Sequence, residues 1–195
     1  MQSIWYFEGS HIGHTAEHIL PSGSMQLLVN LHDDTLRWSD AGQHALRGTA
    51  VAGAYARAFT IDTAQQQRIT GVQFTPGGAA AFLPGSMRTF FETHIALTSL
   101  PAWRFVREML LEAASPRSVL KTWRRLLQAQ LRPVDRRVNA ACRLLSQGRS
   151  LRTVADAVAW SPRTLRQRFS SATGLPPKTF ARVQRLQRLT AALAS

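Results

Sequence analysis

Cysteine is almost absent from this 195-residue sequence, whose single example is Cys142. A chain that cannot form an internal disulfide fits a reducing compartment, and we expect a cytoplasmic protein. No stretch approaches the roughly 18 consecutive apolar residues that a membrane-spanning helix needs. Residues 1–10 carry no positive charge and include Glu8, which is not the pattern of a signal peptide. We therefore expect no membrane partner.

The motifs of common enzyme classes are missing as well. The segment 75–79 is rich in glycine, but a phosphate-binding loop ends in a lysine and a hydroxyl residue, whereas alanines follow here. We find no Gly-x-Ser-x-Gly motif, no cysteine with a motif-placed histidine and no paired acidic signature of a hydrolase. The sequence thus predicts neither an enzyme nor a bound cofactor, and residues 75–79 are expected to form a turn.

Acidic residues are scarce in the second half of the chain. Residues 1–100 hold 5 of the 24 Lys and Arg and 7 of the 11 Asp and Glu, a net charge of −2, so the other 19 and 4 give residues 101–195 a net charge of +15. A basic half joined to a nearly neutral half is typical of a nucleic-acid-binding protein with a second module. General affinity for polyanions or membrane surfaces is the alternative explanation.

The first hundred residues have the pattern of a β-rich domain. Residues 25–31 partly alternate between apolar and polar side chains, and turn signals flank them at 21–23 and 33–34. Further short runs of strand-favouring residues occupy 4–7, 35–38, 49–55, 58–61 and 68–74. Many short strands separated by turns predict a barrel or a sandwich.

After Pro101 the apolar residues recur at helical spacing, up to an interruption at Pro133, and the spacing resumes over 134–147 with Gly148 as a stop. The apolar stripe of Leu120, Trp123 and Leu127 either packs within the chain or pairs two chains as a homodimer. Cys142 shares a helical face with other apolar residues, so we expect a buried small side chain rather than a redox sensor.

Residues 150–180 predict two short helices joined by a tight turn. Ser150 is a helix-capping residue before the apolar positions 151, 154, 155 and 158, and Ser161 followed by Pro162 is a cap with proline at the first helical position. Gly174 is expected to end the second helix in a left-handed conformation, and the prolines at 176–177 to start a third. This layout is typical of a helix-turn-helix DNA-binding unit.

One face of the second helix carries Arg163, Arg166 and Gln167, away from the apolar Leu165 and Phe169. Arginine can donate two hydrogen bonds to guanine, and glutamine can pair in the same bidentate way with adenine. We therefore expect these three residues to read bases in a major groove. An ordinary solvated helix face is the alternative.

Several features of this segment resemble the DNA-binding region of the AraC/XylS family of bacterial transcription regulators: the helix 154–159, the run 161–169, Thr173-Gly174, Pro177, Phe180 and Arg185-Leu186. In that family the positions of Arg163, Arg166 and Gln167 face the bases. Nearby Thr164, Arg168 and Lys178 are candidates for phosphate contacts, which set register without reading sequence.

In the same family a long connector helix, here carrying Gln184, Arg185 and Arg188, leads to a second helix-turn-helix. The sequence stops at Ser195, where that second unit is expected. One helix-turn-helix unit alone should bind DNA more weakly and less selectively than two. A truncated sensor or dimerisation fragment without specific DNA binding is therefore the alternative function.

The first half shows a second resemblance. Residues 19–23 leading into 27–31, residues 71–79, Pro84 and residues 100–103 resemble the cupin-like sensor domain of many AraC-type regulators. Such domains bind a small-molecule effector or mediate pairing, but these motifs imply no particular ligand and no effector-binding residues.

A metal-dependent cupin enzyme is a further alternative, because imidazole and carboxylate groups suit zinc or iron. The donors at close spacing are His11, His14, Glu17 and His18, with His32 further on. Their spacing does not match the HxH-plus-glutamate set of metal-binding cupins, so we predict no metal site.

Taken together, the sequence predicts an α+β protein with a cupin-like β-rich sensor domain over residues 1–100, a helical linker over 101–132 and a partial AraC-type DNA-binding domain over 133–195. Its expected partners are double-stranded DNA and an effector.

Overall fold

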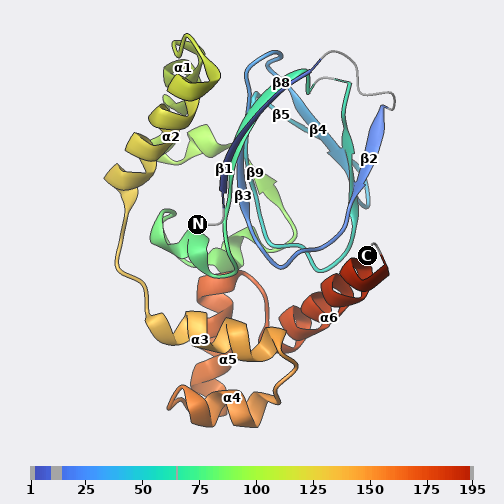
Figure 1. The fold of residues 1–195 in the computed structure, drawn as a ribbon, viewed down its shortest axis with the longest axis vertical. Helices are drawn as coiled ribbons and strands as arrows, with labels where there is room; N and C mark the ends of the chain where they lie inside the picture. The colour runs from blue at the N-terminus through green and yellow to red at the C-terminus, as the bar shows by residue number, and fades with distance from the viewer. Residues whose placement is uncertain (1–2, 10–14, 65, 194–195) are drawn as a thin grey trace.

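The computed structural model describes residues 3–9, 15–64 and 66–193. They form an α+β fold in which two antiparallel sheets within the first hundred residues precede six α-helices (Figure 1). No helix in these ranges is long and apolar enough to cross a bilayer.

The two sheets face each other (Figure 1). The five-stranded sheet has the order β1 (Ser3–Glu8), β8 (Arg68–Gln73), β3 (Gln26–Asn30), β6 (Thr49–Ala52) and β9 (His94–Ile95). The four-stranded sheet has the order β2 (Ala16–Ile19), β7 (Phe59–Asp62), β4 (Leu36–Ser39) and β5 (Gln43–Leu46). Each of the six predicted strand runs contains or overlaps a strand.

Strand β3 shows how the five-stranded sheet divides its side chains. Because successive side chains of a strand point to opposite faces, Leu27 and Val29 pack into the larger core with the helices, whereas Leu28 packs with Leu36 and Ile69 in a small cluster between the sheets. The sheet is therefore apolar on both faces, one covered by helices and one facing the other sheet.

The described chain between β8 and α1 contains β9 and four 3-10 helices: η1 (Gly78–Ala81), η2 (Met87–Phe90), η3 (Leu97–Ser99) and η4 (Pro101–Trp103). The α-helices are α1 (Val106–Leu111), α2 (Pro116–Gln130), α3 (Arg136–Ser146), α4 (Leu151–Ala157), α5 (Pro162–Thr173) and α6 (Pro177–Leu193). The glycine-rich segment turns the chain as expected, with the Gly78 N–H donating to the Thr75 carbonyl over 2.8 Å, and then continues as η1.

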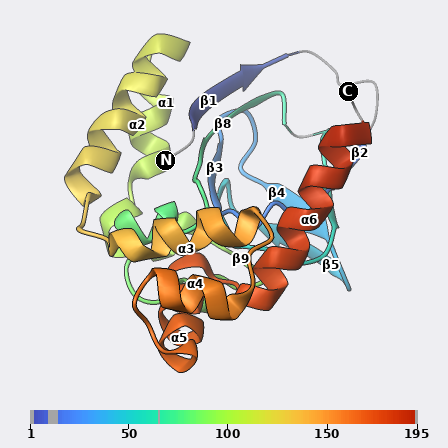
Figure 2. The ribbon, with the colours of Figure 1, turned by 60° about the horizontal axis from the view of Figure 1, so that its bottom comes forward.

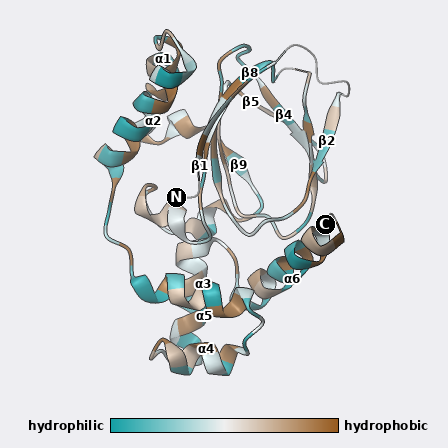
Figure 3. Ribbon diagram, in the orientation of Figure 1, coloured by the Kyte–Doolittle hydropathy of each residue, from teal (hydrophilic) through white to brown (hydrophobic). Residues whose placement is uncertain are grey.

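Helix α2 lies along β1, with hydrophilic residues on its outer turns (Figure 3). Trp123 and Leu127 are buried, and the Trp123 indole donates to the Thr70 hydroxyl over 3.0 Å. Two residues of the predicted stripe, Trp123 and Leu127, thus pack within the chain, whereas Leu120 is half-buried and its neighbour Val119 is buried instead. Cys142 is also buried, which raises the pKa of its thiol to about 12 and leaves it in the unreactive protonated form.

The basic half is packed onto the β half through one continuous core, which runs from Leu27 in β3 to Phe180 in α6. Helix α5 contacts η1 and η2, and α6 passes beneath the sheets (Figure 2). Helix α4 lies at the end of the molecule farthest from the sheets (Figure 1).

Candidate nucleic-acid interface and ligand pocket

Capping residues set the boundaries of α4 and α5 as the sequence predicts. The Ser150 hydroxyl accepts a hydrogen bond from the Thr153 N–H, and the Ser161 hydroxyl accepts one from the Thr164 N–H, each over 3.1 Å. Gly174 ends α5 with φ of 84°. These caps satisfy N–H groups that a helix start leaves unpaired, so both helices are well defined locally.

The turn between α4 and α5 covers residues 158–161. Ala159 has a positive φ of 51°, which carries the chain around the corner. Trp160 is buried there, and its backbone N–H donates to the Ala155 carbonyl over 2.9 Å. A buried indole at the corner fixes the two helices relative to each other.

Helix α5 has one buried and one exposed face. Leu165 and Phe169 are buried, and the Phe169 ring meets the Phe180 ring edge-on with centroids 5.3 Å apart. The predicted base-reading residues all lie on the exposed side; they are Arg163, Arg166 and Gln167. The structure therefore leaves this face open to a partner.

The three candidate phosphate contacts differ in their surroundings. The Thr164 hydroxyl pairs with the Ser161 hydroxyl over 2.9 Å, and Lys178 is exposed in the first turn of α6. Arg168 instead forms an ion pair with Asp135 over 3.4 Å. Of these three side chains, Lys178 alone forms no hydrogen bond or ion pair with another described residue.

Sequence reasoning missed the role of Asp135. This residue caps α3, and hydrogen bonds from Arg137 hold the pKa of its carboxyl below the usual value. Arg137 and Arg168 also lie over the Trp160 ring, 5.0 and 5.7 Å from its centroid. We call Asp135, Arg137, Trp160 and Arg168 the Trp160 cluster. An aspartate just before a helix signals a cap, but nothing local signals its pairing with Arg168.

The structure describes only part of the histidine-rich segment. His11 and His14 lie outside the described residues. Glu17 and His18 are exposed on β2, where His18 Nδ1 pairs with the Thr60 hydroxyl over 2.9 Å, and His32 is exposed after β3. Within residues 3–9, 15–64 and 66–193 no three His, Cys, Asp or Glu side chains form a group able to hold a metal ion.

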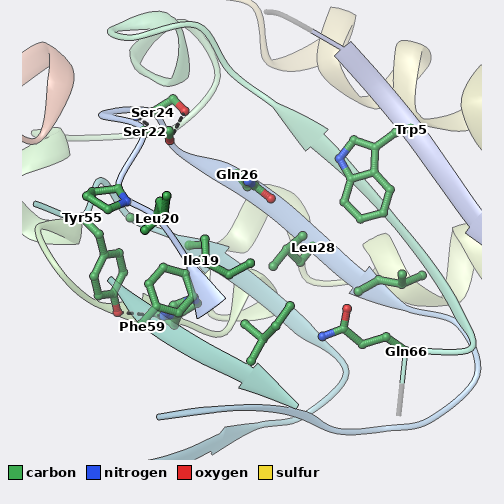
Figure 4. A pocket seen from close by; sticks show the side chains of 16 residues that line it. Trp5, Ile19, Leu20, Ser22, Ser24, Gln26, Leu28, Tyr55, Phe59 and Gln66 are labelled. Carbon is green, nitrogen blue, oxygen red and sulfur yellow. Dashed lines mark hydrogen bonds between the residues drawn. The ribbon is translucent and has the colours of Figure 1, made fainter. Parts of the chain in front are cut away.

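A pocket of about 200 Å³ opens between the two sheets (Figure 4). Its walls come from strands of both sheets, and its rim comes from the turn after β2, the segment after β6 and β9. Among the described residues, no lining side chain is Lys, Arg, Asp or Glu. The lining consists of Trp5, Ile19, Leu20, Pro21, Ser22, Ser24, Gln26, Leu28, Ala52, Gly53, Tyr55, Phe59, Ile61, Gln66, Ile69 and His94.

His94 and Tyr55 form the polar corner of this pocket. The Tyr55 hydroxyl and His94 Nδ1 are 2.9 Å apart. Burial lowers the pKa of His94 to about 4, and burial together with nearby carboxylates raises the pKa of Tyr55 to about 12. Both side chains are therefore uncharged near neutral pH.

The pocket rim is also the place where α6 meets the β half. The Gln184 side-chain amide donates to the Ser22 carbonyl over 2.8 Å, and the Gln187 amide donates to the Pro21 carbonyl over 2.7 Å. The sequence predicted α6 only as a connector helix. Its contact with a rim 162 residues away has no local sequence signal.

Comparison with known proteins identifies the first half alone. No curated protein and no solved structure matches the chain. Residues 1–96 match a family model described as "Domain of unknown function (DUF6597)". The β-rich N-terminal part of this chain is thus a DUF6597 domain, followed by helices that this match does not cover.

Proposed function

We propose that the protein is a cytoplasmic DNA-binding transcription regulator of the AraC/XylS type, in which α4 and α5 form a helix-turn-helix and the cupin-like β half senses an effector. The observation that carries the proposal is the exposed face of α5, where Arg163, Arg166 and Gln167 stand on a helix capped at both ends. A major groove about 12 Å wide admits such a helix.

The charge distribution supports the same proposal. Residues 101–195 hold 19 of the 24 Lys and Arg. Exposed arginines also occur outside α5, including Arg152 on α4 and Arg182 and Arg185 on α6. Phosphate contacts by such side chains add affinity that does not depend on sequence, and they position the base-reading helix.

Selection of binding sites from a random duplex pool tests this function directly. Affinity for the selected duplex is then compared with affinity for a scrambled duplex at two salt concentrations. Enrichment of a short motif with a clear specificity ratio is the expected result. Salt-sensitive binding without enrichment would leave only phosphate attraction. It would favour a sensor or pairing module without specific DNA binding, a role that the pocket between the sheets also fits.

An Arg166→Ala variant separates base reading from phosphate contact. We expect it to lose about 1–3 kcal/mol of preference at one base position of the selected site. Arg117→Ala, which changes an exposed arginine on α2, is the matched control and should leave the preference intact. A uniform loss across all sequences in Arg166→Ala would assign Arg166 to the backbone instead.

A further inference from the structure

We propose that the pocket between the sheets binds an uncharged small molecule with an apolar ring or chain and a hydrogen-bond acceptor that His94 recognises. This inference rests on the sensing role proposed above for the β half and does not depend on DNA reading. The residues that carry it are the polar corner at His94 and Tyr55 and the apolar walls opposite.

The lack of charge in the pocket lining restricts which ligands it can bind. The pocket offers no ionised side chain among the residues described as lining it, and its one histidine is neutral. A carboxylate or an ammonium ion would therefore be buried without an ion-pair partner, which costs far more than burying a neutral group. The pocket selects against charged ligands of either sign.

The direction of the hydrogen bonds at the polar corner determines which nitrogen of His94 carries the proton. The Trp38 indole, which can only donate, acts on the Tyr55 hydroxyl and partly offsets the rise of its pKa. In this proposal the Tyr55 hydroxyl donates to His94 Nδ1, which lies 2.9 Å away. A neutral histidine that accepts at Nδ1 carries its proton on Nε2. In the described part of the chain no residue accepts a hydrogen bond from this Nε2–H group. It can therefore donate to a ligand.

The walls and the volume of the pocket restrict the polarity and size of the ligand. Phe59 and Ile61 from one sheet and Trp5, Leu28 and Ile69 from the other provide apolar walls. Figure 4 shows the labelled Trp5, Leu28 and Phe59 around the space. The cavity of about 200 Å³ is smaller than the roughly 300–1,000 Å³ typical of drug-sized ligands. The ligand is therefore small, on the scale of one substituted ring.

The fixed orientation of His94 strengthens this assignment. Its ring lies 4.4 Å from the Trp38 ring and meets the Phe59 ring edge-on at 5.1 Å, both measured between centroids. Aromatic contacts on two sides and the hydrogen bond from Tyr55 hold the imidazole in one position. A donor that is already oriented loses little freedom when a ligand binds.

Three probes of similar size test the proposal with the full chain and without DNA. Benzamide has a ring and a neutral carbonyl acceptor, benzene lacks the acceptor, and benzoate carries a charge. Thermal unfolding and tryptophan fluorescence report binding, since a ligand of the folded state raises Tm and Trp5 lines the pocket. We expect benzamide to bind about 2- to 10-fold more tightly than benzene and at least about tenfold more tightly than benzoate.

Two variants locate the binding. Ala52→Leu fills part of the cavity from β6 and should abolish binding of all three probes. His94→Phe keeps an aromatic ring but removes the donor, so benzene binding should persist while the advantage of benzamide disappears. Equal binding of benzoate and benzamide, no binding of any probe, or undiminished binding by Ala52→Leu would each overturn the proposal. Because no DNA is present, these failures are distinct from a failure to select a DNA site.

Discussion

The side-chain amide of Gln184 in α6 donates a hydrogen bond of 2.8 Å to the backbone carbonyl of Ser22, at the rim of the pocket. Its amide oxygen accepts a second hydrogen bond from the Ser146 hydroxyl at the end of α3, over 3.1 Å. One side chain thus links the pocket rim, α3 and α6. In the proposed regulator this is a direct physical connection between the sensing half and the DNA-binding half.

We expect the double variant Gln184→Ala, Gln187→Ala to loosen α6 from the rim. The variant removes the two hydrogen bonds to rim carbonyls and the one from Ser146. At about 0.5–1.5 kcal/mol each, the free energy of unfolding should fall by about 1.5–4.5 kcal/mol. Urea unfolding measures this loss. Gln128→Ala, on the exposed face of α2, makes the same chemical change without a rim contact and should have a small effect. Equal stability losses in both variants would show that the rim contacts add nothing.

Gly23 tests how closely the rim and α6 must approach. It has φ of +73°, and an added Cβ would lie 3.1 Å from the Phe180 ring and 3.2 Å from Gln184 Nε2. We expect Gly23→Ala to destabilise the fold by more than about 1 kcal/mol, through backbone strain and displacement of α6.

Gly85 supplies the matched control for this substitution. Its φ of +75° is nearly the same, but a Cβ there would meet no atom within 4 Å. Gly85→Ala therefore has the backbone strain without the collision. The excess loss of stability in Gly23→Ala, measured by denaturant unfolding, reports the contact with α6, and equal losses would deny it.

Asp135 is expected to weaken the affinity for DNA by holding Arg168 in an ion pair. Asn is as good a helix cap as Asp, so Asp135→Asn should preserve α3 while freeing the positive charges of Arg168 and Arg137, which both pair with Asp135. We expect tighter binding to non-specific duplex and a salt dependence steeper by about one to two phosphate contacts. Asp156→Asn, on the exposed side of α4, changes net charge equally. If both variants bind alike, net charge explains the gain and the ion pair does not.

The helix boundaries of the basic half could be predicted because their signals are local. Ser150, Ser161 and Gly174 act on backbone groups within a few residues of themselves, so sequence spacing is enough to place them. The strands β2 and β5 could not be found in this way. Their side chains are mostly exposed, as at Glu17 and His44, and a strand without a buried face has no apolar alternation to detect.

The pocket and its link to α6 lay beyond sequence reasoning for a different reason. Lining residues such as Trp5, Leu28, Phe59 and His94 come from separate strands, and they converge only through sheet pairing and the facing of the two sheets. Local sequence fixes the face of a strand but not its neighbours. The partners of Gln184 and Arg168 are set by the same long-range packing.

Thr70 anchors α2 to the sheet through two hydrogen bonds in series. The Trp123 indole donates to the Thr70 hydroxyl over 3.0 Å, and that hydroxyl donates to the Trp5 carbonyl over 2.6 Å. Thr70→Val would leave the buried indole N–H unpaired, and we expect a loss of about 1–3 kcal/mol in the free energy of unfolding. Thr70→Ser keeps the hydroxyl and should retain most of the stability. A Ser variant as unstable as the Val variant would assign the effect to packing.

His94 should make the fold sensitive to acid. Its pKa is about 4 in the folded protein because of burial, against an ordinary value of 6.5. Between these two pH values the unfolded chain binds the proton more readily than the folded one, so stability rises with pH and is lost as pH falls from about 6.5 towards 4. One pKa unit corresponds to about 1.4 kcal/mol, so the loss attributable to this side chain reaches about 3 kcal/mol.

Urea unfolding at a series of pH values measures this dependence. His94→Gln removes the titrating group, so stability in the variant should fall less steeply between pH 6.5 and 4 than in the native protein. His32→Gln, at an exposed position, is the control and should retain the native steepness. Since His94 in the folded protein stays neutral down to about pH 4, benzamide should stabilise the native protein by a similar amount throughout this pH range. An unchanged slope in His94→Gln would place the acid sensitivity elsewhere in the chain.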